Sequence, residues 1–95
     1  MLFMVIERFA TGRVPEVYQL VRERGRSIPE GLTYINSWVA ASLDRCFQIM
    51  ETDDPALFQE WIVSWGDLVE FEIMPITESK ATSDLMRRIA ESTGE

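Results

Sequence analysis

The segment formed by residues 45–76 most constrains the fold, because it contains a strand, a helix and a second strand with almost no intervening loop. Its first apolar run ends before Asp54, a favourable helix N-cap residue, and the expected helix ends at Gly66, ahead of a second apolar run. Trp61 and Trp65 lie four residues apart, so they share one face of that helix. We expect the core to form where this face contacts a sheet.

The remaining elements follow from apolar patterns that are interrupted by Gly and Pro. We expect strands at residues 2–9, 32–40, 45–50 and 67–76, and helices at 14–25, 55–66 and 79–89. This order predicts an α+β, ferredoxin-like βαββαβ fold with a C-terminal helix and a four-stranded antiparallel sheet. The first and third strands are then central, and the first two helices cover one face. Residues 1–78 form the ferredoxin-like domain, and residues 79–95 form a C-terminal helix and tail.

The side-chain pattern of the second strand predicts that another molecule covers the sheet face that the helices leave open. By strict alternation, Tyr34, Asn36 and Trp38 point to one side of the sheet, and the residues between them point to the other. Either set leaves large apolar side chains on the face that the helices do not cover. We therefore expect a homodimer in which two sheets pack together around a two-fold axis, as a dimeric α/β barrel.

Composition excludes several classes of protein. The net charge of −7 argues against nucleic acid as a partner, so we interpret Arg22, Arg24 and Arg26 as a solvated helix end. No window has the roughly 18 consecutive apolar residues of a membrane span. The single cysteine, Cys46, permits no internal disulfide, and we expect a cytoplasmic protein. We interpret Cys46 as a small buried hydrophobe.

The chain contains no histidine, and this absence removes His-ligated haem, His-based zinc sites and every Ser/His or Cys/His nucleophile pair. The acidic cluster at residues 52–54 is explained by the cap of the following helix. We therefore expect no metal site and no cofactor.

The candidate site consists of polar residues on the sheet face that lies away from the helices. We expect Tyr34, Asn36, Trp38 and Gln48 to line a small ligand pocket there, because polar groups on a covered face need partners. The alternative is a plainly packed dimer interface. Glu7 and Glu72 lie on neighbouring strands, and either is a candidate base if it is desolvated. Otherwise each forms a salt bridge.

Three segments together resemble a known group of proteins. They are RCFQIMETDDPALFQEWIVSWGDLVEFEIMPI, the opening strand MLFMVIERF, and RERGRSIPEGLTYINSW. Over about residues 1–76 they resemble a family of uncharacterised, mostly bacterial proteins, a domain of unknown function within the dimeric α/β-barrel superfamily. The relatives of that family include cofactor-free antibiotic-biosynthesis monooxygenases, muconolactone isomerases and haem-dependent chlorite dismutases. The resemblance implies the fold and the dimer but no activity, and the absence of histidine argues against the haem-binding relatives.

These observations lead to one functional hypothesis and two alternatives. The hypothesis is a small dimeric protein that binds a small organic ligand on the open sheet face. One alternative is a non-enzymatic regulatory or structural dimer module. The other is a cofactor-free monooxygenase or isomerase in which Glu7 or Glu72 moves a proton, so the sequence leaves open whether the protein is an enzyme.

Overall fold

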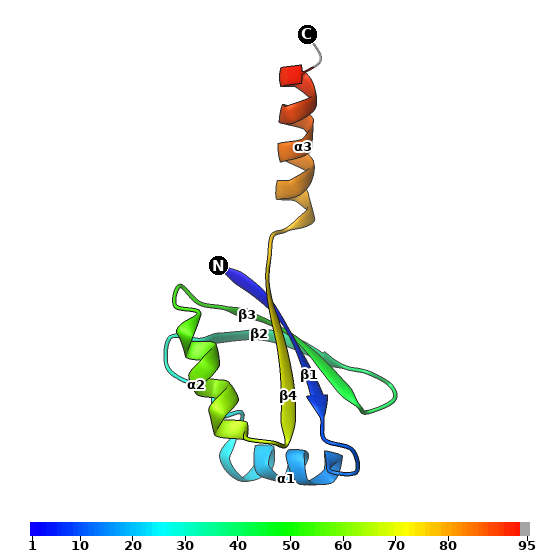
Figure 1. Ribbon diagram of the computed structural model, residues 1–95, viewed down its shortest axis with the longest axis vertical. Coiled ribbons are helices and arrows are strands. Elements are labelled where there is room, and N and C mark those ends of the chain that lie inside the picture. The colour runs from blue at the N-terminus through cyan, green and yellow to red at the C-terminus, as the bar shows by residue number, and fades with distance from the viewer. Residues whose placement is uncertain (94–95) are drawn as a thin grey trace.

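The structure is a computed structural model that describes residues 1–93. Its elements are β1 (Leu2–Phe9), α1 (Val14–Arg24), β2 (Thr33–Val39), β3 (Arg45–Glu51), α2 (Ala56–Trp65), β4 (Val69–Ile76) and α3 (Ser79–Thr93). The four strands form one antiparallel sheet in the order β2-β3-β1-β4 (Figure 1). The predicted ferredoxin-like fold is confirmed, with β1 and β3 in the centre and β2 and β4 at the edges.

Helix α2 begins and ends close to the predicted positions for identifiable reasons. The Asp54 carboxylate accepts a hydrogen bond of 3.1 Å from the backbone N–H of Ala56, and so satisfies one of the free donors at the helix start. Gly66 follows the last helical residue with φ of 61°, a left-handed conformation that favours glycine. Strand β4 then begins at Val69, two residues later than predicted.

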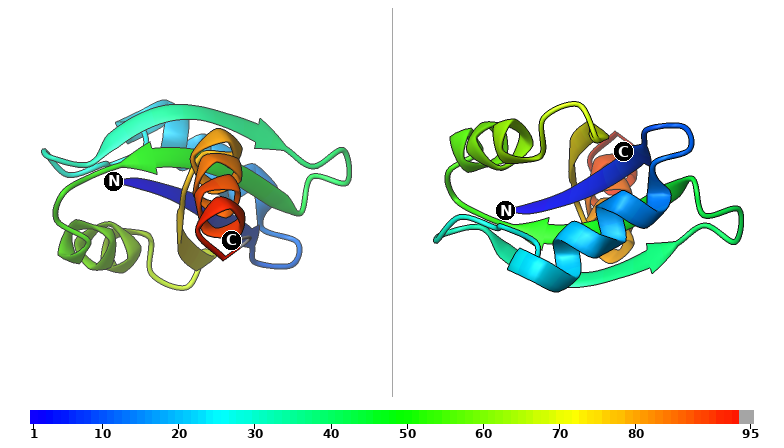
Figure 2. Two further views of the ribbon diagram at one scale, coloured as in Figure 1. Left: turned by 90° about the horizontal axis from the view of Figure 1, so that it is seen from above. Right: turned by 90° about the horizontal axis from the view of Figure 1, so that it is seen from below.

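The core lies between the sheet and the helices α1 and α2. Trp61 and Trp65 of α2 are both buried, with Trp61 only 1% exposed, and Trp61 lies 4.8 Å from the ring of Phe71 in β4. Phe3 of β1 forms an edge-on contact with Phe58 of α2 at 4.9 Å. Figure 2 shows α1 on this side of the sheet, in front of the strands when the molecule is seen from below. The predicted role of the tryptophan pair in the core is confirmed.

Strand β2 contains a β-bulge that the sequence did not predict. Tyr34 lies opposite Met50, but the next paired residue, Asn36, lies opposite Ile49, so Ile35 is an extra residue. The bulge reverses the alternation, because an inserted residue turns every later side chain to the other face. Ser37 therefore shares the helix-covered face with Tyr34, whereas Asn36 lies on the other face. The prediction of strict alternation along this strand is wrong.

The sheet face opposite the helices is not covered by any other element in residues 1–93. The register places one set of alternating side chains from all four strands on this open face, and its centre is apolar. The apolar members are Leu2, Met4, Ile6, Trp38, Phe47, Ile49, Met74 and Ile76. Trp38 is the most accessible of the three tryptophans, with 53% of its surface exposed. The uncovered apolar face expected from the sequence is thus present.

Helix α3 stands apart from the rest of the molecule. It continues from the end of β4 and projects away from the domain, which gives the chain overall dimensions of 59 × 30 × 18 Å (Figure 1). None of its residues is buried. In Figure 2, α3 lies in front of the sheet in the view from above and behind it in the view from below, which is the reverse of α1. Helix α3 therefore projects on the side of the open face.

Candidate functional site

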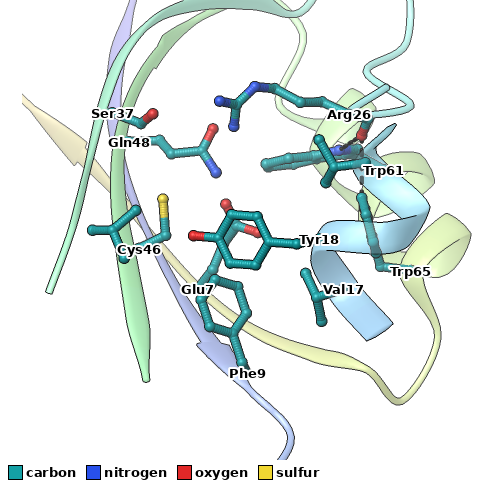
Figure 3. A pocket seen from close by; sticks show the side chains of 12 residues that line it. Glu7, Phe9, Val17, Tyr18, Arg26, Ser37, Cys46, Gln48, Trp61 and Trp65 are labelled. Atoms are coloured by element: carbon teal, nitrogen blue, oxygen red, sulfur yellow. Dashed lines mark hydrogen bonds between the residues drawn. The ribbon is translucent and has the colours of Figure 1, made fainter. Parts of the chain in front are cut away.

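A cavity of about 100 Å³ lies between the sheet and the helices α1 and α2 (Figure 3). Its apolar walls include Val17 and Val21 of α1 and the two tryptophans of α2. Polar side chains reach it from three strands, from α1 and from the loop after α1. These are Glu7, Tyr18, Arg26, Ser37, Cys46 and Gln48. The cavity therefore combines an apolar lining with several groups that can bind or transfer protons.

Glu7 is the acidic residue of the cavity, and strand alternation places it there. Phe3 and Val5 occupy the preceding inward positions of β1, so Glu7 is the third residue in a buried row and only 7% exposed. Burial raises the pKa of Glu7 from 4.5 to about 7, because the charged form loses its hydration, although the positive charge of Arg26 opposes the shift. At neutral pH this carboxyl is therefore present in both protonation states, as a general acid or base requires.

Gln48 brings an unsatisfied hydrogen-bond acceptor to the same cavity. It occupies the middle of the central strand β3, between Val5 of β1 and Ser37 of β2, and is 1% exposed. Its side chain projects into the cavity, and its Oε1 atom has no hydrogen-bond partner within the described chain (Figure 3). A buried polar atom without a partner typically costs about 1 to 3 kcal/mol. A molecule in the cavity that donates a hydrogen bond to Oε1 would recover that cost.

Arg26 is held at the cavity by the tryptophan pair. The Nε1 atoms of Trp61 and Trp65 both donate hydrogen bonds to the backbone carbonyl of Arg26, at 2.9 and 3.1 Å. Ser27, the following residue, has φ of 58°, an uncommon conformation for a residue other than glycine. The two tryptophans therefore pack in the core and also fix the backbone of a strained loop. Arg26 lies in this loop, and its guanidinium lines the cavity.

The side chain of Arg26 stacks on Tyr34. The guanidinium carbon lies 4.3 Å from the centre of the Tyr34 ring, which is a cation–π contact. Arg26 Nη2 also donates a long hydrogen bond of 3.5 Å to the Tyr34 hydroxyl, which lies 2.5 Å from Ser37 Oγ. These contacts leave Arg26 as a positioned cation at the edge of the cavity, where it can stabilise negative charge on a ligand or on Glu7.

Cys46 and Tyr18 add two weak acids to the lining. Burial and the nearby Glu7 raise the pKa of the Cys46 thiol to about 11, so the thiol is protonated at neutral pH. Burial also raises the pKa of the Tyr18 hydroxyl. Neither group is an activated nucleophile in this state, and both are available as hydrogen-bond donors. The interpretation of Cys46 as a buried, unreactive side chain agrees with its environment.

The four predicted ligand-binding residues do not form one site. Tyr34 and Gln48 lie on the helix-covered face, and Gln48 lines the same cavity as Trp61. Asn36 and Trp38 lie on the open face, and Asn36 Oδ1 accepts a hydrogen bond of 2.8 Å from the backbone of Ser37. The prediction of a shared pocket on the open face is therefore wrong, because the bulge in β2 separates the four side chains.

The two candidate bases also lie on opposite faces of the sheet. Strands β1 and β4 are neighbours, as predicted, but Glu72 pairs with Ile6, whereas Glu7 pairs with Phe71. The Glu72 carboxylate lies 3.3 Å from Arg8 on the open face, in the salt bridge considered as an alternative from the sequence. Glu72 is thus excluded from the cavity, and Glu7 remains as the candidate base.

Sequence reasoning missed Tyr18, Arg26 and Ser37 as members of the cavity. The sequence analysis placed Arg26 in a solvated cluster with Arg22 and Arg24. In the structure Arg22 and Arg24 are exposed, whereas Arg26 is partly buried. A signal for Glu7 was present, because it ends the buried row of β1 at an inward position. No comparable pattern marks Arg26, since it lies in a loop and its position depends on contacts with residues 35 and 39 positions further along the chain.

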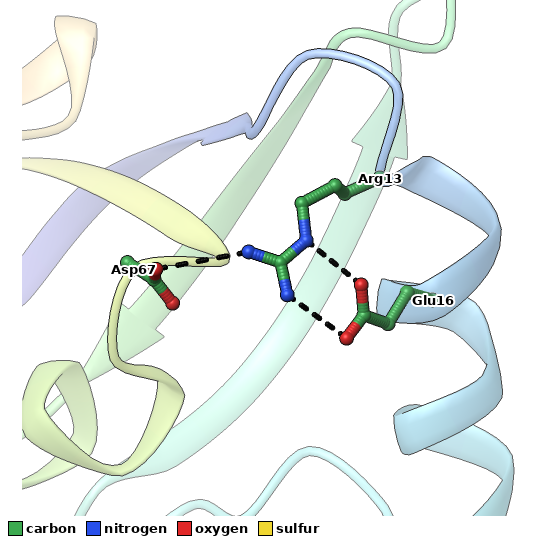
Figure 4. A network of polar contacts seen from close by, with 3 residues as sticks. All are labelled: Arg13, Glu16 and Asp67. Carbon is green, nitrogen blue, oxygen red and sulfur yellow. Dashed lines mark hydrogen bonds and ion pairs between the residues drawn. The ribbon is translucent and has the colours of Figure 1, made fainter.

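A second polar cluster on the surface has a structural role. Arg13 binds both carboxylate oxygens of Glu16, at 2.8 and 2.9 Å, and its third nitrogen lies 3.7 Å from Asp67 (Figure 4). The hydrogen bonds from Arg13 lower the pKa of Glu16. Arg13 thus contacts a carboxylate in the first turn of α1 and another in the loop before β4, and we assign these contacts a role in joining the two segments.

Two other kinds of feature, a metal site and a membrane-spanning helix, are absent from residues 1–93. Within residues 1–93, no three His, Cys, Asp or Glu side chains lie close enough together to hold a metal ion. None of the helices in that part of the chain is sufficiently long and apolar to cross a membrane. The cavity is therefore the candidate functional site.

Comparisons with known proteins identify the family. The family described as "Domain of unknown function (DUF3303)" matches residues 1–90, so the chain belongs to it. The predicted resemblance to an uncharacterised family is confirmed. The chain is also similar to the crystal structure of protein Atu4242 from Agrobacterium tumefaciens, with 13% identity, a TM-score of 0.48, and coverage of 83% of this chain and 96% of that chain. A putative antibiotic biosynthesis monooxygenase from Deinococcus radiodurans gives 11% identity, a TM-score of 0.48, and coverage of 83% and 95%. No curated protein matches the sequence.

Proposed function

We propose that this member of the DUF3303 family binds a small organic ligand in the cavity between the sheet and the helices α1 and α2. The observation that carries the proposal is the buried Oε1 atom of Gln48, which has no partner within the described chain and belongs to a side chain that lines the same cavity as Glu7. A protein that only needed a packed core would be more stable with an apolar residue at each of these two positions. Their presence is explained if a ligand supplies the missing partners.

The size and chemistry of the cavity define the ligand class. A cavity of about 150 Å³ holds benzene, so the present volume of about 100 Å³ suits a molecule somewhat smaller than benzene, or one part of a larger molecule. The apolar walls favour a hydrocarbon body. Gln48 Oε1 requires an O–H or N–H group on the ligand, and Arg26 favours partial negative charge nearby. Small alcohols, phenols and amides meet these requirements.

We also propose that the protein acts as a homodimer in the reducing cytoplasm. The open face presents eight apolar side chains from all four strands, a pattern typical of an interaction surface, and a second copy of the same face is its simplest cover. The free thiol of Cys46 is compatible with a reducing compartment. In this arrangement the ligand cavities lie on the outer sides of the paired sheets, one in each protomer, because the helices cover the faces that point away from the interface.

The pKa of Glu7 favours acid–base catalysis as a second candidate function. A carboxylate with a pKa of about 7 can remove a proton from a carbon atom next to a ligand carbonyl and return it to another carbon of the same molecule. This is a cofactor-free isomerisation, and it consumes no other reactant. For any ketone that binds, deuterium incorporation from D₂O by the native protein but not by Glu7→Gln would support this function.

A thermal-shift screen with matched pairs of fragments tests ligand binding. Each pair contains a single-ring alcohol, phenol or amide and the same ring with a methyl group in place of the donor. A fragment present at ten times its Kd stabilises the folded state by about 1.4 kcal/mol. For a domain of this size, we expect Tm to rise by about 6 to 11 °C. Only the donor-bearing member of each pair should produce the full shift.

Gln48→Met provides the matched control, since methionine has a similar length but no strong acceptor. In this variant the two members of each pair should give equal shifts, while the Tm of the free protein stays the same or rises. The proposal is wrong if no fragment stabilises the native protein, or if the donor preference persists unchanged in Gln48→Met.

A further inference from the structure

Helix α3 carries an apolar stripe that its own chain does not cover. Leu85 and Ile89 are four residues apart and Met86 lies beside them, so all three fall on adjoining parts of one side of the helix. They are 43%, 47% and 58% exposed, respectively. A helix of 15 residues with an amphipathic pattern and no buried residue is marginally stable in water, because most helical stability in proteins comes from packing of the apolar face. The stripe therefore needs a surface to pack against.

The direction of α3 limits which surface this can be. The helix projects away from its own domain on the side of the open face, as the two views of Figure 2 show. Two residues, Thr77 and Glu78, separate it from β4, which itself contributes Met74 and Ile76 to that face. The apolar stripe and the apolar open face thus lie on the same side of one protomer, joined through β4. A molecule that covers the open face will also lie beside α3.

Distances favour a second copy of the chain as that molecule. Two sheets that pack face to face lie about 10 Å apart, whereas a helix of 15 residues is about 22 Å long. Helix α3 of one protomer therefore extends past the sheet of a second protomer stacked on the open face. By two-fold symmetry the second protomer returns the same contact, so both stripes are covered at once.

The charge distribution agrees with this partner. Helix α3 contains three basic residues, Lys80, Arg87 and Arg88, against two acidic residues, Asp84 and Glu91, although the whole chain has a net charge of −7. Arg88 lies one residue before Ile89 and borders the apolar stripe. The body of a second copy is strongly acidic, and it would attract a helix with an excess of basic residues.

We propose that α3 is an exchanged arm, which packs Leu85, Met86 and Ile89 against the flank of a second copy of this chain. This inference rests on the proposed homodimer, because the same two-fold arrangement brings the second copy within reach. The arm adds contact area outside the paired sheets, because α3 of each protomer packs against the other protomer. The site that it assigns is an interface and not a ligand-binding site.

Isotope-filtered NMR on a mixed sample provides a direct test. One half of the protein carries ¹³C-labelled Leu and Ile methyl groups, and the other half is unlabelled. We expect intermolecular contacts between the methyl groups of Leu85 and Ile89 and protons of the unlabelled copy. Sedimentation equilibrium on Leu85→Ser/Ile89→Ser should show a dimer dissociation constant at least tenfold larger than that of the native protein. The control Lys80→Ser/Glu91→Ser, which changes the other side of α3 and leaves its net charge unchanged, should alter it less than threefold.

The outcomes separate the arm from the dimer. A native dimer without methyl contacts between the copies, or with an unchanged dissociation constant in the Leu85/Ile89 variant, overturns the arm and leaves the homodimer in place. A native protein that is monomeric at 100 μM overturns both. Because α3 makes no buried contact in its own chain, neither double variant should change the fold of residues 1–78, and circular dichroism on each variant checks this.

Discussion

Glu7 combines burial with a titrating charge, so the stability of the protein should depend on its protonation. The pKa of Glu7 is raised from 4.5 to about 7 in the folded state. Between these two values the folded protein holds a proton that the unfolded chain releases. The stabilising contribution of the protonated form is therefore complete below pH 4.5 and is lost as the pH rises through 7. One pKa unit corresponds to about 1.4 kcal/mol, so the total loss is about 3 kcal/mol.

We predict that Glu7→Gln removes this loss, because glutamine has nearly the same shape and does not titrate. Urea unfolding at pH 5 and at pH 8 measures the effect in both proteins. Between pH 5 and pH 8, the free energy of unfolding of the native protein should fall by about 2 to 3 kcal/mol more than that of the variant. Losses caused by other groups are equal in the two proteins and cancel in this comparison. Identical pH dependence in the two proteins would show that the Glu7 carboxyl is not desolvated in solution.

Trp61 stabilises the fold in two ways, because its side chain fills the core and also binds the backbone of the loop that contains Arg26. It is 1% exposed, and its Nε1 atom donates a hydrogen bond of 2.9 Å to the Arg26 carbonyl. We predict that Trp61→Ala lowers the free energy of unfolding by about 3 to 5 kcal/mol, out of about 5 to 15 for a whole domain. Glu60→Ala, on the exposed side of the same helix, should change it by less than about 0.5 kcal/mol. Equal denaturation midpoints for the two variants would contradict this assignment of the helix face.

The elements themselves were predictable because each has a local cause. The spacing of Trp61 and Trp65 sets the buried face of α2. The Asp54 carboxylate, which binds the N–H of the first helical residue, and the terminating Gly66 set its limits, and all of these act within a few residues of the helix. Strand order followed from the right-handed crossovers and the single hairpin. Only the starts and ends of elements shifted, as for β4, since they depend on capping details that propensity does not resolve.

The bulge at Ile35 was not predictable, and it explains why the predicted site was wrong. A bulge needs only one extra residue, and Ile35 is an ordinary strand residue with no Gly or Pro to mark it. Its effect is nevertheless large, because Tyr34 and Asn36 come to lie on opposite faces. The inward orientation of Gln48 required the register of β3 against β1 and β2, and this register depends on pairing across the sheet rather than on neighbours in the chain.

At the scale of the whole molecule, the two faces of the sheet differ in chemistry, and we propose a separate role for each. The helix-covered side of the sheet contains the cavity with Glu7 and Gln48, and the open side contains the apolar face and the arm α3. The proposed ligand and the proposed second copy would therefore contact different residues. The central strands β1 and β3 contribute to both, through side chains that alternate between the two faces.

Trp38 allows the proposed homodimer to be measured without a label. It lies on the open face and is 53% exposed, whereas Trp61 and Trp65 are 1% and 5% exposed. Acrylamide quenching of tryptophan fluorescence in a monomer should therefore come almost entirely from Trp38. If the open face is the interface, dilution from 100 μM to 0.1 μM should increase the quenching constant, because dissociation returns Trp38 to solvent.

We predict that Trp38→Glu weakens the dimer strongly, because a charge placed in a closed apolar interface loses its hydration without gaining a partner. An aromatic hot spot contributes about 2 kcal/mol or more, and two-fold symmetry places two such residues in the interface. Sedimentation equilibrium should therefore show a dissociation constant raised by at least a hundredfold. Val63→Glu provides the control, since Val63 is 79% exposed on α2, away from the open face. A dimer that is equally stable in Trp38→Glu and in Val63→Glu would show that the two protomers associate through some surface other than the open face.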